Sequence, residues 1–335
     1  MLKVLVDMNV HLPSLEKLRA IENVSVHTIE PAEKARVIPA AEVQDVDFLF
    51  CTCPPSNLDD MKKLKIVQIA SAGYTQLLGL DLPKRNIKAC NAAGVNDIPI
   101  AQWNIAMMIN LLRNVRGMIR NQEVGIWDRS ACFQRDIRGL TLGIWGYGGI
   151  GRETARLAKA MGLKVYVLDF NVGPRPAMYV VAGTGDPQGV LPDKVFLPAQ
   201  QKEFLSGLDF LMLSMPLTKK TEGIIGDEQL SMLQPHAFLL NPARGPLIRE
   251  SSLLNALRKG LIAGAAIDTH YYYPMPADHP LWKFPNVIMT PHISGSTASP
   301  NFLPLLWDIV TQNVYRFQTG QPLLNELSTT QLAGG

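Results

Sequence analysis

The segment 146–151 has the sequence GYGGIG and matches the pattern G-x-G-x-x-G, which can bind phosphates at the start of a helix. In such a turn the first glycine permits the tight bend, the second allows a ligand to approach the backbone, and the third lets the helix pack on the preceding strand. A predicted strand precedes the segment and a helical pattern follows it. We therefore predict a dinucleotide site that includes Gly146, Tyr147, Gly148, Gly149, Ile150 and Gly151.

An acidic residue suited to a ribose follows at the expected place. Asp169 ends the next predicted strand, eighteen residues after Gly151. A carboxylate there would accept hydrogen bonds from a ribose diol and repel a 2′-phosphate, which favours NAD over NADP. Arg175 lies six residues further on and could still admit a phosphate. NAD is therefore the expected cofactor, and NADP is the less favoured alternative.

Two further residues could bind an anion and transfer a proton. Arg244 lies in the run Leu-Asn-Pro-Ala-Arg-Gly, and an arginine can bind a carboxylate in bidentate fashion. His292 lies in the run Pro-His-Ile-Ser-Gly, and a histidine titrates near neutral pH, so it can act as acid or base. His270 and His279 are instead interpreted as structural or solvated.

The length and composition indicate what must position these residues. A chain of 335 residues is longer than most single domains, so we expect two. Hydrophobic residues make up 47% and charged residues 18%, which excludes a disordered chain. A net charge of +3 without a basic run argues against nucleic-acid binding and mildly favours an anionic substrate. Polar residues interrupt the most apolar window, Ile98–Leu112, so we expect no contact with a membrane.

The cysteines and the N-terminus indicate the compartment. The four cysteines do not have the paired spacing of metal ligands, so we expect no metal site. We expect them to be reduced thiols, as in a cytoplasmic chain; they are Cys51, Cys53, Cys90 and Cys132. Asp7 and Asn9 lie inside the apolar N-terminal run, which predicts a first strand and not a signal peptide.

The order of predicted elements favours parallel sheets. Strands predicted at Lys3–Val6, Phe48–Cys51 and Lys65–Ala70 are separated by helical patterns, and a second series of alternating strands and helices begins at Thr141. A long helix is predicted over 97–118. The Gly- and Pro-rich segment Val172–Pro192 is interpreted as an insertion loop.

Several motifs occur together in the order of one known family. The glycine turn is followed by Pro-Leu-Thr at 216–218, Thr-Glu-Gly at 221–223, the Arg244 run and the His292 run. Ser-Ala-Gly at 71–73 and Asn-Ala-Ala-Gly-Val at 91–95 precede them. Over nearly its whole length the chain resembles the D-isomer-specific 2-hydroxyacid dehydrogenases.

The resemblance implies an α/β fold of two doubly wound parallel-sheet domains, with the active site in the cleft between them. Residues 1–100 and 296–335 would form a flavodoxin-like substrate domain, and residues 101–295 a Rossmann domain that binds NAD. The family is usually dimeric, so we expect a homodimer.

The resemblance also assigns roles to individual residues. Arg244 would bind the carboxylate and carbonyl of the substrate, His292 would be the acid or base, and the backbone at Ala72 and Gly73 would hold the other carboxylate oxygen. Asp268 would lie near the nicotinamide. The remaining expected cofactor contacts are Asp169, Ser214, Met215, Pro216, Thr221, Pro242, Ala243, His292 and Gly295.

The chain departs from the family at a third catalytic position. The family's glutamate, which pairs with the histidine and keeps it protonated, is replaced by Tyr273, twenty-nine residues after Arg244. Tyr273 therefore joins Arg244 and His292 among the candidate catalytic residues. Without a carboxylate, His292 would have a lower pKa and would work better at acid pH. Alternatively Asp278 would reach the histidine, or hydride transfer would be weak.

Three functions follow from these alternatives. The first is an NAD-dependent oxidoreductase that acts on a small 2-hydroxy or 2-keto acid. The second, supported by the missing glutamate, is an NADH-binding sensor related to transcriptional corepressors, with little turnover. The third is a dehydrogenase of a bulkier sugar acid or alcohol that uses the tyrosines and the insertion loop.

Overall fold

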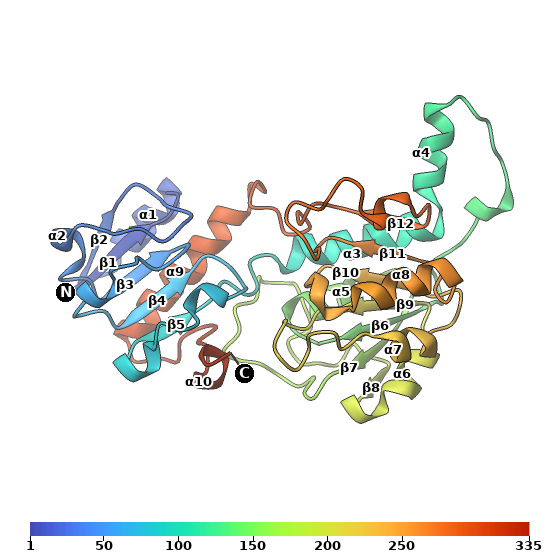
Figure 1. The fold of residues 1–335 in the computed structure, drawn as a ribbon. Coiled ribbons are helices and arrows are strands. Elements are labelled where there is room, and N and C mark those ends of the chain that lie inside the picture. Colours follow the sequence, from blue (N-terminus) through green and yellow to red (C-terminus); the bar gives the residue numbers. More distant parts are fainter. Residues whose placement is uncertain (335) are drawn as a thin grey trace. The chain divides into compact units, whose positions relative to one another are not determined.

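The chain folds into two α/β units, each built around one parallel sheet (Figure 1). The computed structural model describes residues 1–334. The first unit comprises Met1–Asn96, Pro176–Val181 and the residues from Thr297 onward; the second comprises Asp97–Arg175 and Ala182–Ser296. The expected fold class of two doubly wound parallel-sheet domains is confirmed.

The sheet of the first unit consists of β1 (Leu2–Asp7), β2 (Val24–Thr28), β3 (Phe48–Cys51), β4 (Ile66–Ile69) and β5 (Lys88–Cys90). The strand order is β2-β1-β3-β4-β5, and all neighbours are parallel. This is the flavodoxin-like order. Every residue of β3 and β4 is buried, as expected for central strands of a sheet covered on both faces.

The helices of the first unit are α1 (Leu12–Arg19), α2 (Ala40–Val43), α9 (Phe302–Gln318) and α10 (Thr329–Leu332). Helix α9 comes from the end of the chain but packs on strands from its beginning. Trp307 on α9 is fully buried, meets the ring of Phe50 edge-on at 5.5 Å and donates from Nε1 to the carbonyl of Asn9. This packing holds the C-terminal segment on the first unit.

The predicted insertion loop contributes to the core of the first unit. Tyr179 is buried, and its hydroxyl donates to Asp308 on α9 at 2.8 Å. Its backbone N–H donates to the side chain of Asn325, which also donates to the carbonyl of Ala93. A Cβ at Gly94 would lie 2.3 Å from the carbonyl oxygen of Tyr179, so the close approach requires glycine. The domain boundaries expected from the sequence, at residues 100 and 295, had assigned this segment to the Rossmann domain, whereas Pro176–Val181 belongs to the first unit.

The sheet of the second unit consists of seven parallel strands, β6 (Thr141–Trp145), β7 (Lys164–Leu168), β8 (Lys194–Phe196), β9 (Phe210–Leu213), β10 (Phe238–Asn241), β11 (Gly264–Ile267) and β12 (Val287–Met289). Their order is β12-β11-β10-β9-β6-β7-β8, so winding reverses between β6 and β9. In an open parallel sheet, ligands bind beyond the carboxyl ends of the strands at such a reversal.

The helices of the second unit are α3 (Asp97–Leu112), α4 (Val115–Glu123), α5 (Gly149–Ala160), α6 (Gln201–Ser206), α7 (Asp227–Met232) and α8 (Glu250–Lys259). The single helix predicted over 97–118 is wrong, because Asn114 adopts a left-handed conformation with φ +46°. Its side chain then accepts the backbone N–H of Gly117 and starts α4 in a new direction. Helix α4 projects from the second unit (Figure 1).

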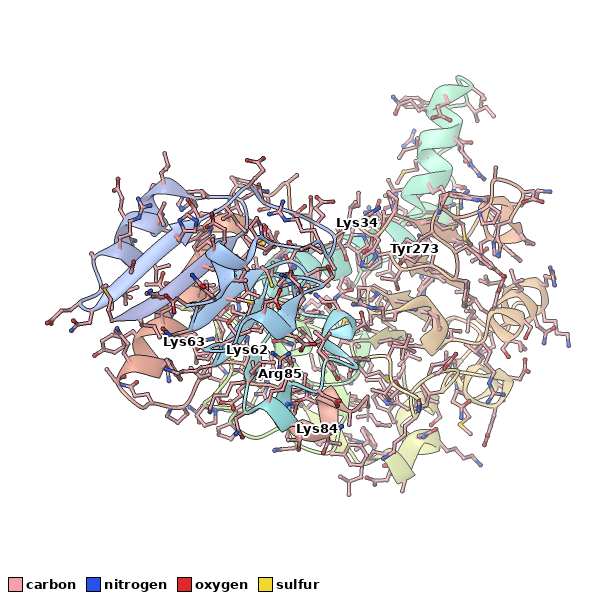
Figure 2. All side chains as sticks on the ribbon, turned by 60° about the vertical axis from the view of Figure 1, so that its left-hand side comes forward. Lys34, Lys62, Lys63, Lys84, Arg85 and Tyr273 are labelled. Carbon is pink, nitrogen blue, oxygen red and sulfur yellow. The ribbon has the colours of Figure 1, made fainter. Side chains whose placement is uncertain are left out.

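The basic side chains labelled on the first unit in Figure 2 are mostly paired with acids. These pairs are Lys63–Asp45, Lys84–Asp81 and Arg85–Asp59.

Among residues 1–334, no helix combines the length and apolar character that crossing a bilayer requires.

Candidate active site

The glycine turn between β6 and α5 has the geometry that a phosphate-binding turn requires. Gly146 has φ +98°, and a Cβ there would lie 2.9 Å from the backbone nitrogen of Met215. Gly148 precedes α5 in extended conformation, and no side chain caps the helix start. A Cβ at Gly148 would meet no atom within 4 Å, so an external group can approach the backbone there. The N–H groups at the start of α5 therefore suit a pyrophosphate.

The other glycines of this turn allow close packing. A Cβ at Gly151 would lie 2.6 Å from the carbonyl oxygen of Gly146. At Gly149 a Cβ would lie 1.8 Å from the carboxylate of Asp97 at the start of α3. Larger residues at either position would push α5 away from the turn or from α3.

Asp169 follows β7 beside the glycine turn. Its Oδ2 accepts the backbone N–H of Tyr147 at 2.5 Å, and its Oδ1 accepts the N–H of Asn171 at 3.0 Å. Arg175 lies 3.8 Å from the same carboxylate. These contacts hold an acid at the place where a dinucleotide presents its ribose, with a cation at its side.

Tyr147 contributes its backbone to the turn, while its side chain points into the protein. The ring is fully buried, and its hydroxyl donates to Asp186 at 2.7 Å. Burial and the neighbouring carboxylate raise the pKa of Tyr147 far above its usual value. The buried guanidinium of Arg152 lies over the same ring and donates to the carbonyls of Tyr147, Val172 and Gly173. The insertion loop is thereby tied to the underside of the glycine turn.

The segment after β9 closes the other side of the turn. The Ser214 hydroxyl donates to the carbonyl of Gly146, and Met215 is buried. The Thr221 hydroxyl donates to the carbonyl of Pro216 at 2.7 Å. Ser214, Met215 and Pro216 therefore adjoin the predicted cofactor turn, and Thr221 holds their loop in place.

Arg244 is held by a turn that begins at the end of β10. The buried Asn241 accepts the N–H groups of Ala243 and Arg244 through Oδ1 and donates from Nδ2 to the carbonyl of Arg244. A Cβ at Gly245 would lie 2.4 Å from the carbonyl oxygen of His270, so the turn passes close to the segment after β11. The Arg244 side chain itself is exposed and donates to the carbonyl of Ala243. Its guanidinium can therefore meet a ligand.

His292 lies in a tight turn after β12, and Asp268 holds that turn. The backbone of His292 has φ +57°, and its N–H donates to the carbonyl of Asp268 at 2.8 Å. The fully buried carboxylate of Asp268 accepts from the Thr290 hydroxyl, the N–H of Ile293, and both the N–H and hydroxyl of Ser294. Asp268 was predicted to lie near the nicotinamide; the structure uses its oxygens to position the histidine.

Tyr273 contacts the predicted acid or base directly. Its hydroxyl lies 3.0 Å from Nδ1 of His292 and accepts the backbone N–H of His270 at 3.1 Å. The Tyr273 side chain is 60% exposed (Figure 2). The alternative partner, Asp278, is exposed and makes no described contact with His292 in residues 1–334. The phenol is therefore the group that contacts Nδ1 of the histidine.

The loop that carries Tyr273 is anchored by buried polar contacts. His279 is buried and lies 2.7 Å from Glu250 on α8, and the Tyr272 hydroxyl donates to the same carboxylate at 3.2 Å. His270 is also buried, with Nε2 2.8 Å from the carbonyl of Thr290. His270 and His279 therefore have structural contacts.

The charges around His292 disfavour its protonated form. Partial burial of the ring lowers the pKa of His292 below its usual value, and the positive charge of Arg244 lowers it further. Asp268 acts in the opposite direction, and His270 adds a smaller lowering effect. At neutral pH the imidazole is therefore mostly neutral.

Two predicted substrate contacts lie in the first unit. Ala72 and Gly73 follow β4, in a loop where the Ser71 hydroxyl donates to the carbonyl of Gly73. Asn91 donates to the carbonyl of Ala72 at 2.7 Å. The loop is thus held through its carbonyls, and its role in binding a carboxylate stays a prediction.

The structure brings together three predicted residues in the second unit and adds others that the sequence did not reveal. Arg244, Tyr273 and His292 follow β10, β11 and β12, neighbouring parallel strands whose carboxyl ends share one sheet edge. Pro242 and Ala243 belong to the Arg244 turn, and Gly295 follows the His292 turn. The unforeseen positioning residues are Asn241 and Asp186. Asparagine side chains often form hydrogen bonds with the backbone of the turn that they begin, and this tendency could have indicated Asn241. No pattern in the sequence indicated Asp186.

The chain is similar to known proteins over most of its length. Residues 105–294 match the family described as D-isomer specific 2-hydroxyacid dehydrogenase, NAD binding domain. The chain is 28% identical to a glyoxylate reductase of Thermofilum pendens, over 88% of this chain and 86% of that one. It is 31% identical to a D-3-phosphoglycerate dehydrogenase of Methanocaldococcus jannaschii, over 89% of this chain but only 54% of that longer relative.

Solved structures share the fold across nearly the whole chain. A D-isomer specific 2-hydroxyacid dehydrogenase family protein from Aeromonas salmonicida superposes with a TM-score of 0.79 at 25% identity, covering 98% of this chain and 99% of that one. An NADPH-dependent glyoxylate/hydroxypyruvate reductase from Sinorhizobium meliloti, solved with NADP, gives a TM-score of 0.76 at 23% identity, covering all of both chains. At that identity the second likeness concerns the fold alone.

Proposed function

Because the chain belongs to the D-isomer-specific 2-hydroxyacid dehydrogenase family, we propose that it transfers a hydride between NAD(H) and a small 2-hydroxy or 2-keto acid. The observation that carries the proposal is that Arg244, which is exposed, and His292, whose ring contacts the Tyr273 hydroxyl, follow β10 and β12 at the same end of one parallel sheet. An anion binder beside a proton carrier is the set that a 2-keto acid needs.

Each residue has a distinct role in this proposal. The guanidinium of Arg244 binds the substrate carboxylate and polarises the adjacent carbonyl. His292 donates a proton to the carbonyl oxygen in reduction and removes it in oxidation. The backbone at Ala72 and Gly73 binds the second carboxylate oxygen. The nicotinamide, when bound, supplies or takes up the hydride.

The dinucleotide would be bound by the glycine turn and Asp169. The open approach at Gly148 and the uncapped start of α5 fit a pyrophosphate. We propose NAD as the preferred form, because the Asp169 carboxylate would repel a 2′-phosphate. Arg175 beside it is the feature that favours the alternative, NADP.

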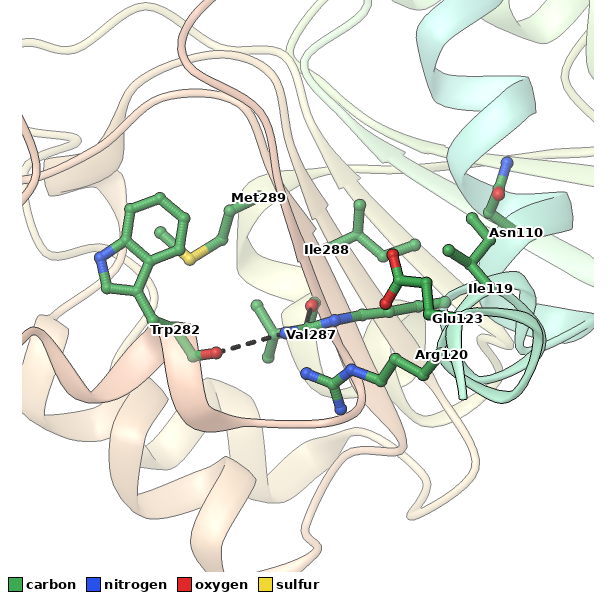
Figure 3. A pocket seen from close by; sticks show the side chains of 9 residues that line it. Asn110, Ile119, Arg120, Glu123, Trp282, Val287, Ile288 and Met289 are labelled. Atoms are coloured by element: carbon green, nitrogen blue, oxygen red, sulfur yellow. Dashed lines mark hydrogen bonds between the residues drawn. The ribbon is translucent and has the colours of Figure 1, made fainter. Parts of the chain in front are cut away.

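We also propose that the chain forms a homodimer through α4. No residue of α4 is buried, and the segment that follows it exposes Ile126 and Trp127, the latter by 89%. A hollow of about 410 Å³ beside α4 is lined by Arg120, Glu123, Trp282 and apolar residues of β12 (Figure 3). Asp128, next to Trp127, is opposite in charge to Arg120. We assign the hollow to the 124–128 segment of a second copy.

The four cysteines are unpaired in the described chain, which supports our proposal of a reducing, cytoplasmic setting.

The function is tested by following NADH oxidation with a panel of small and aromatic 2-keto acids. We expect turnover that is lost in His292→Ala. His236→Ala is the matched control, because His236 is an exposed histidine that pairs with Asp209 away from the site. Full turnover in His292→Ala would contradict the proposal. NADH binding without turnover on any acid would instead favour the sensor.

A further inference from the structure

The hydrogen bonds at Tyr273 define where its own proton can go. The hydroxyl oxygen accepts the backbone N–H of His270 at 3.1 Å. A backbone N–H can only donate, so this contact uses a lone pair of the phenol and leaves its proton available. The second polar contact of the hydroxyl is Nδ1 of His292, at 3.0 Å. The phenol proton is thus available to the imidazole.

A phenol and a carboxylate impose different states on a neighbouring imidazole. An ionised carboxylate can only accept, so it requires a proton on Nδ1 and leaves Nε2 of the neutral ring bare. A phenol can donate to a bare Nδ1, and the neutral ring then carries its proton on Nε2. A phenol and a carboxylate at this place would therefore leave the proton of the neutral ring on different nitrogens.

We propose that Tyr273 donates its hydroxyl proton to Nδ1 of His292, so that the neutral imidazole presents an Nε2–H to the substrate and the two residues form a proton relay. The proposal rests on the proposed function for the identity of the substrate. Tyr273 acts through His292 and is a positioning residue in this sense.

The groups that face His292 leave Tyr273 as the proton source. The Asp268 carboxylate already accepts hydrogen bonds from Thr290, Ile293 and Ser294. The ring of His270 uses its Nε2–H on the carbonyl of Thr290. Arg244 brings a positive charge that disfavours the imidazolium. A neutral imidazole with a neutral donor suits this environment.

The relay balances as a reduction. As the carbonyl carbon gains a hydride, the π electrons move to the oxygen, which forms a bond to the Nε2 proton of His292. The Nε2–H bond breaks, and Nδ1 takes the proton of Tyr273. The phenolate that remains is stabilised by the His270 N–H. It takes the Nδ1 proton back while Nε2 gains a proton from water, which restores the starting tautomer and the phenol. The net proton comes from solvent, and reduction does not require a charged histidine.

Two variants separate this relay from an imidazolium acid. Tyr273→Phe removes the proton donor and keeps the ring, so reduction should slow by about tenfold to a hundredfold near neutral pH. The remaining activity should rise toward acid pH, where His292 becomes charged, while the native profile stays flatter. Tyr273→Glu should keep activity but move the proton of the neutral ring to Nδ1. Tyr272→Phe is the matched control, because Tyr272 bonds Glu250 and not the histidine.

Nitrogen NMR of the isotope-labelled chain without substrate reads the tautomer directly. We expect an Nε2–H neutral imidazole in the native chain and in Tyr272→Phe, and an Nδ1–H one in Tyr273→Glu. An Nδ1–H tautomer in the native chain, or identical pH profiles for native and Tyr273→Phe, would overturn the relay. Full turnover in His292→Ala would contradict the proposed function itself. An inactive His292→Ala variant, together with an Nδ1–H tautomer in the native chain or with identical pH profiles, would contradict the relay alone.

Discussion

The hydroxyl of Tyr273 lies 3.0 Å from Nδ1 of His292, although the two residues belong to separate loops after β11 and β12. The same hydroxyl accepts the backbone N–H of His270. A side chain that can donate as well as accept therefore lies beside the histidine. In the proposed reaction, this contact would determine whether the histidine acts as a neutral or a charged acid.

Arg244→Ala should abolish measurable reduction of 2-keto acids, because the substrate carboxylate and carbonyl lose their charged donor. We expect a fall in kcat/KM of about a hundredfold or more. The measurement is steady-state NADH oxidation at saturating cofactor. Arg249→Ala is the control, since Arg249 is an exposed arginine whose Nε donates to the carbonyl of Gly223. Equal losses in both variants would argue against a specific role.

Arg244→Gln should raise the pKa of His292. The positive charge of Arg244 is one cause of the lowered value, so removing it favours the imidazolium. An NMR titration of the imidazole ring measures the change, with Arg249→Gln as the reference. The expected shift is upward and toward the usual value of about 6.5. A pKa that falls or stays constant would show that the two groups do not interact.

Asp169→Ser should reduce the preference for NADH over NADPH. The carboxylate that repels a 2′-phosphate is lost, while Arg175 remains to attract one. The readout is the ratio of kcat/KM for the two cofactors, and we expect it to change by about tenfold or more. Asp193→Ser, which removes an acid that pairs with Lys159, tests for indirect effects. If native enzyme already prefers NADPH, the proposed cofactor is wrong.

Tyr147→Phe should destabilise the second unit without removing any atom from the cofactor surface. The buried hydroxyl is lost as a donor to Asp186, a change that costs about 1–3 kcal/mol. Thermal unfolding followed by tryptophan fluorescence measures the effect. Tyr315→Phe alters a tyrosine that is 52% exposed and should leave the midpoint nearly unchanged. Equal midpoints for native and Tyr147→Phe would contradict the structural role.

Trp127→Asp should weaken the proposed dimer. Placing a charge where an apolar ring enters a hollow lined by Trp282 and apolar residues costs burial energy, and each 1.4 kcal/mol lowers affinity tenfold. Sedimentation at several protein concentrations measures the association. Leu197→Asp changes a residue that is 55% exposed elsewhere on the second unit and should have no effect. A native chain that sediments as a monomer at all concentrations would refute the dimer.

Local patterns in the sequence predicted most of the scaffold. The strand Phe48–Cys51 was predicted at the residues where it occurs, because it is a short apolar run between turn signals. The second series was predicted to begin at Thr141, which is where β6 begins. The prediction of a single helix over 97–118 failed because an apolar period cannot reveal that Asn114 takes a left-handed conformation. The Val172–Pro192 segment showed only as an irregular stretch, because its order depends on partners such as Asp308 that lie far away in the chain.

The sequence by itself determined the family, the two-sheet fold, the glycine turn and the types of residue at the candidate site, since each of these is encoded in contiguous residues and their spacing. Only the tertiary structure decided which hydrogen-bond partners those residues have. It placed the Tyr273 hydroxyl on His292, turned the Asp268 carboxylate toward the histidine turn and brought Asp186 under Tyr147. The physical reason is that these hydrogen bonds join loops at the ends of different strands. Their partners are set by strand order and packing, which no local pattern contains.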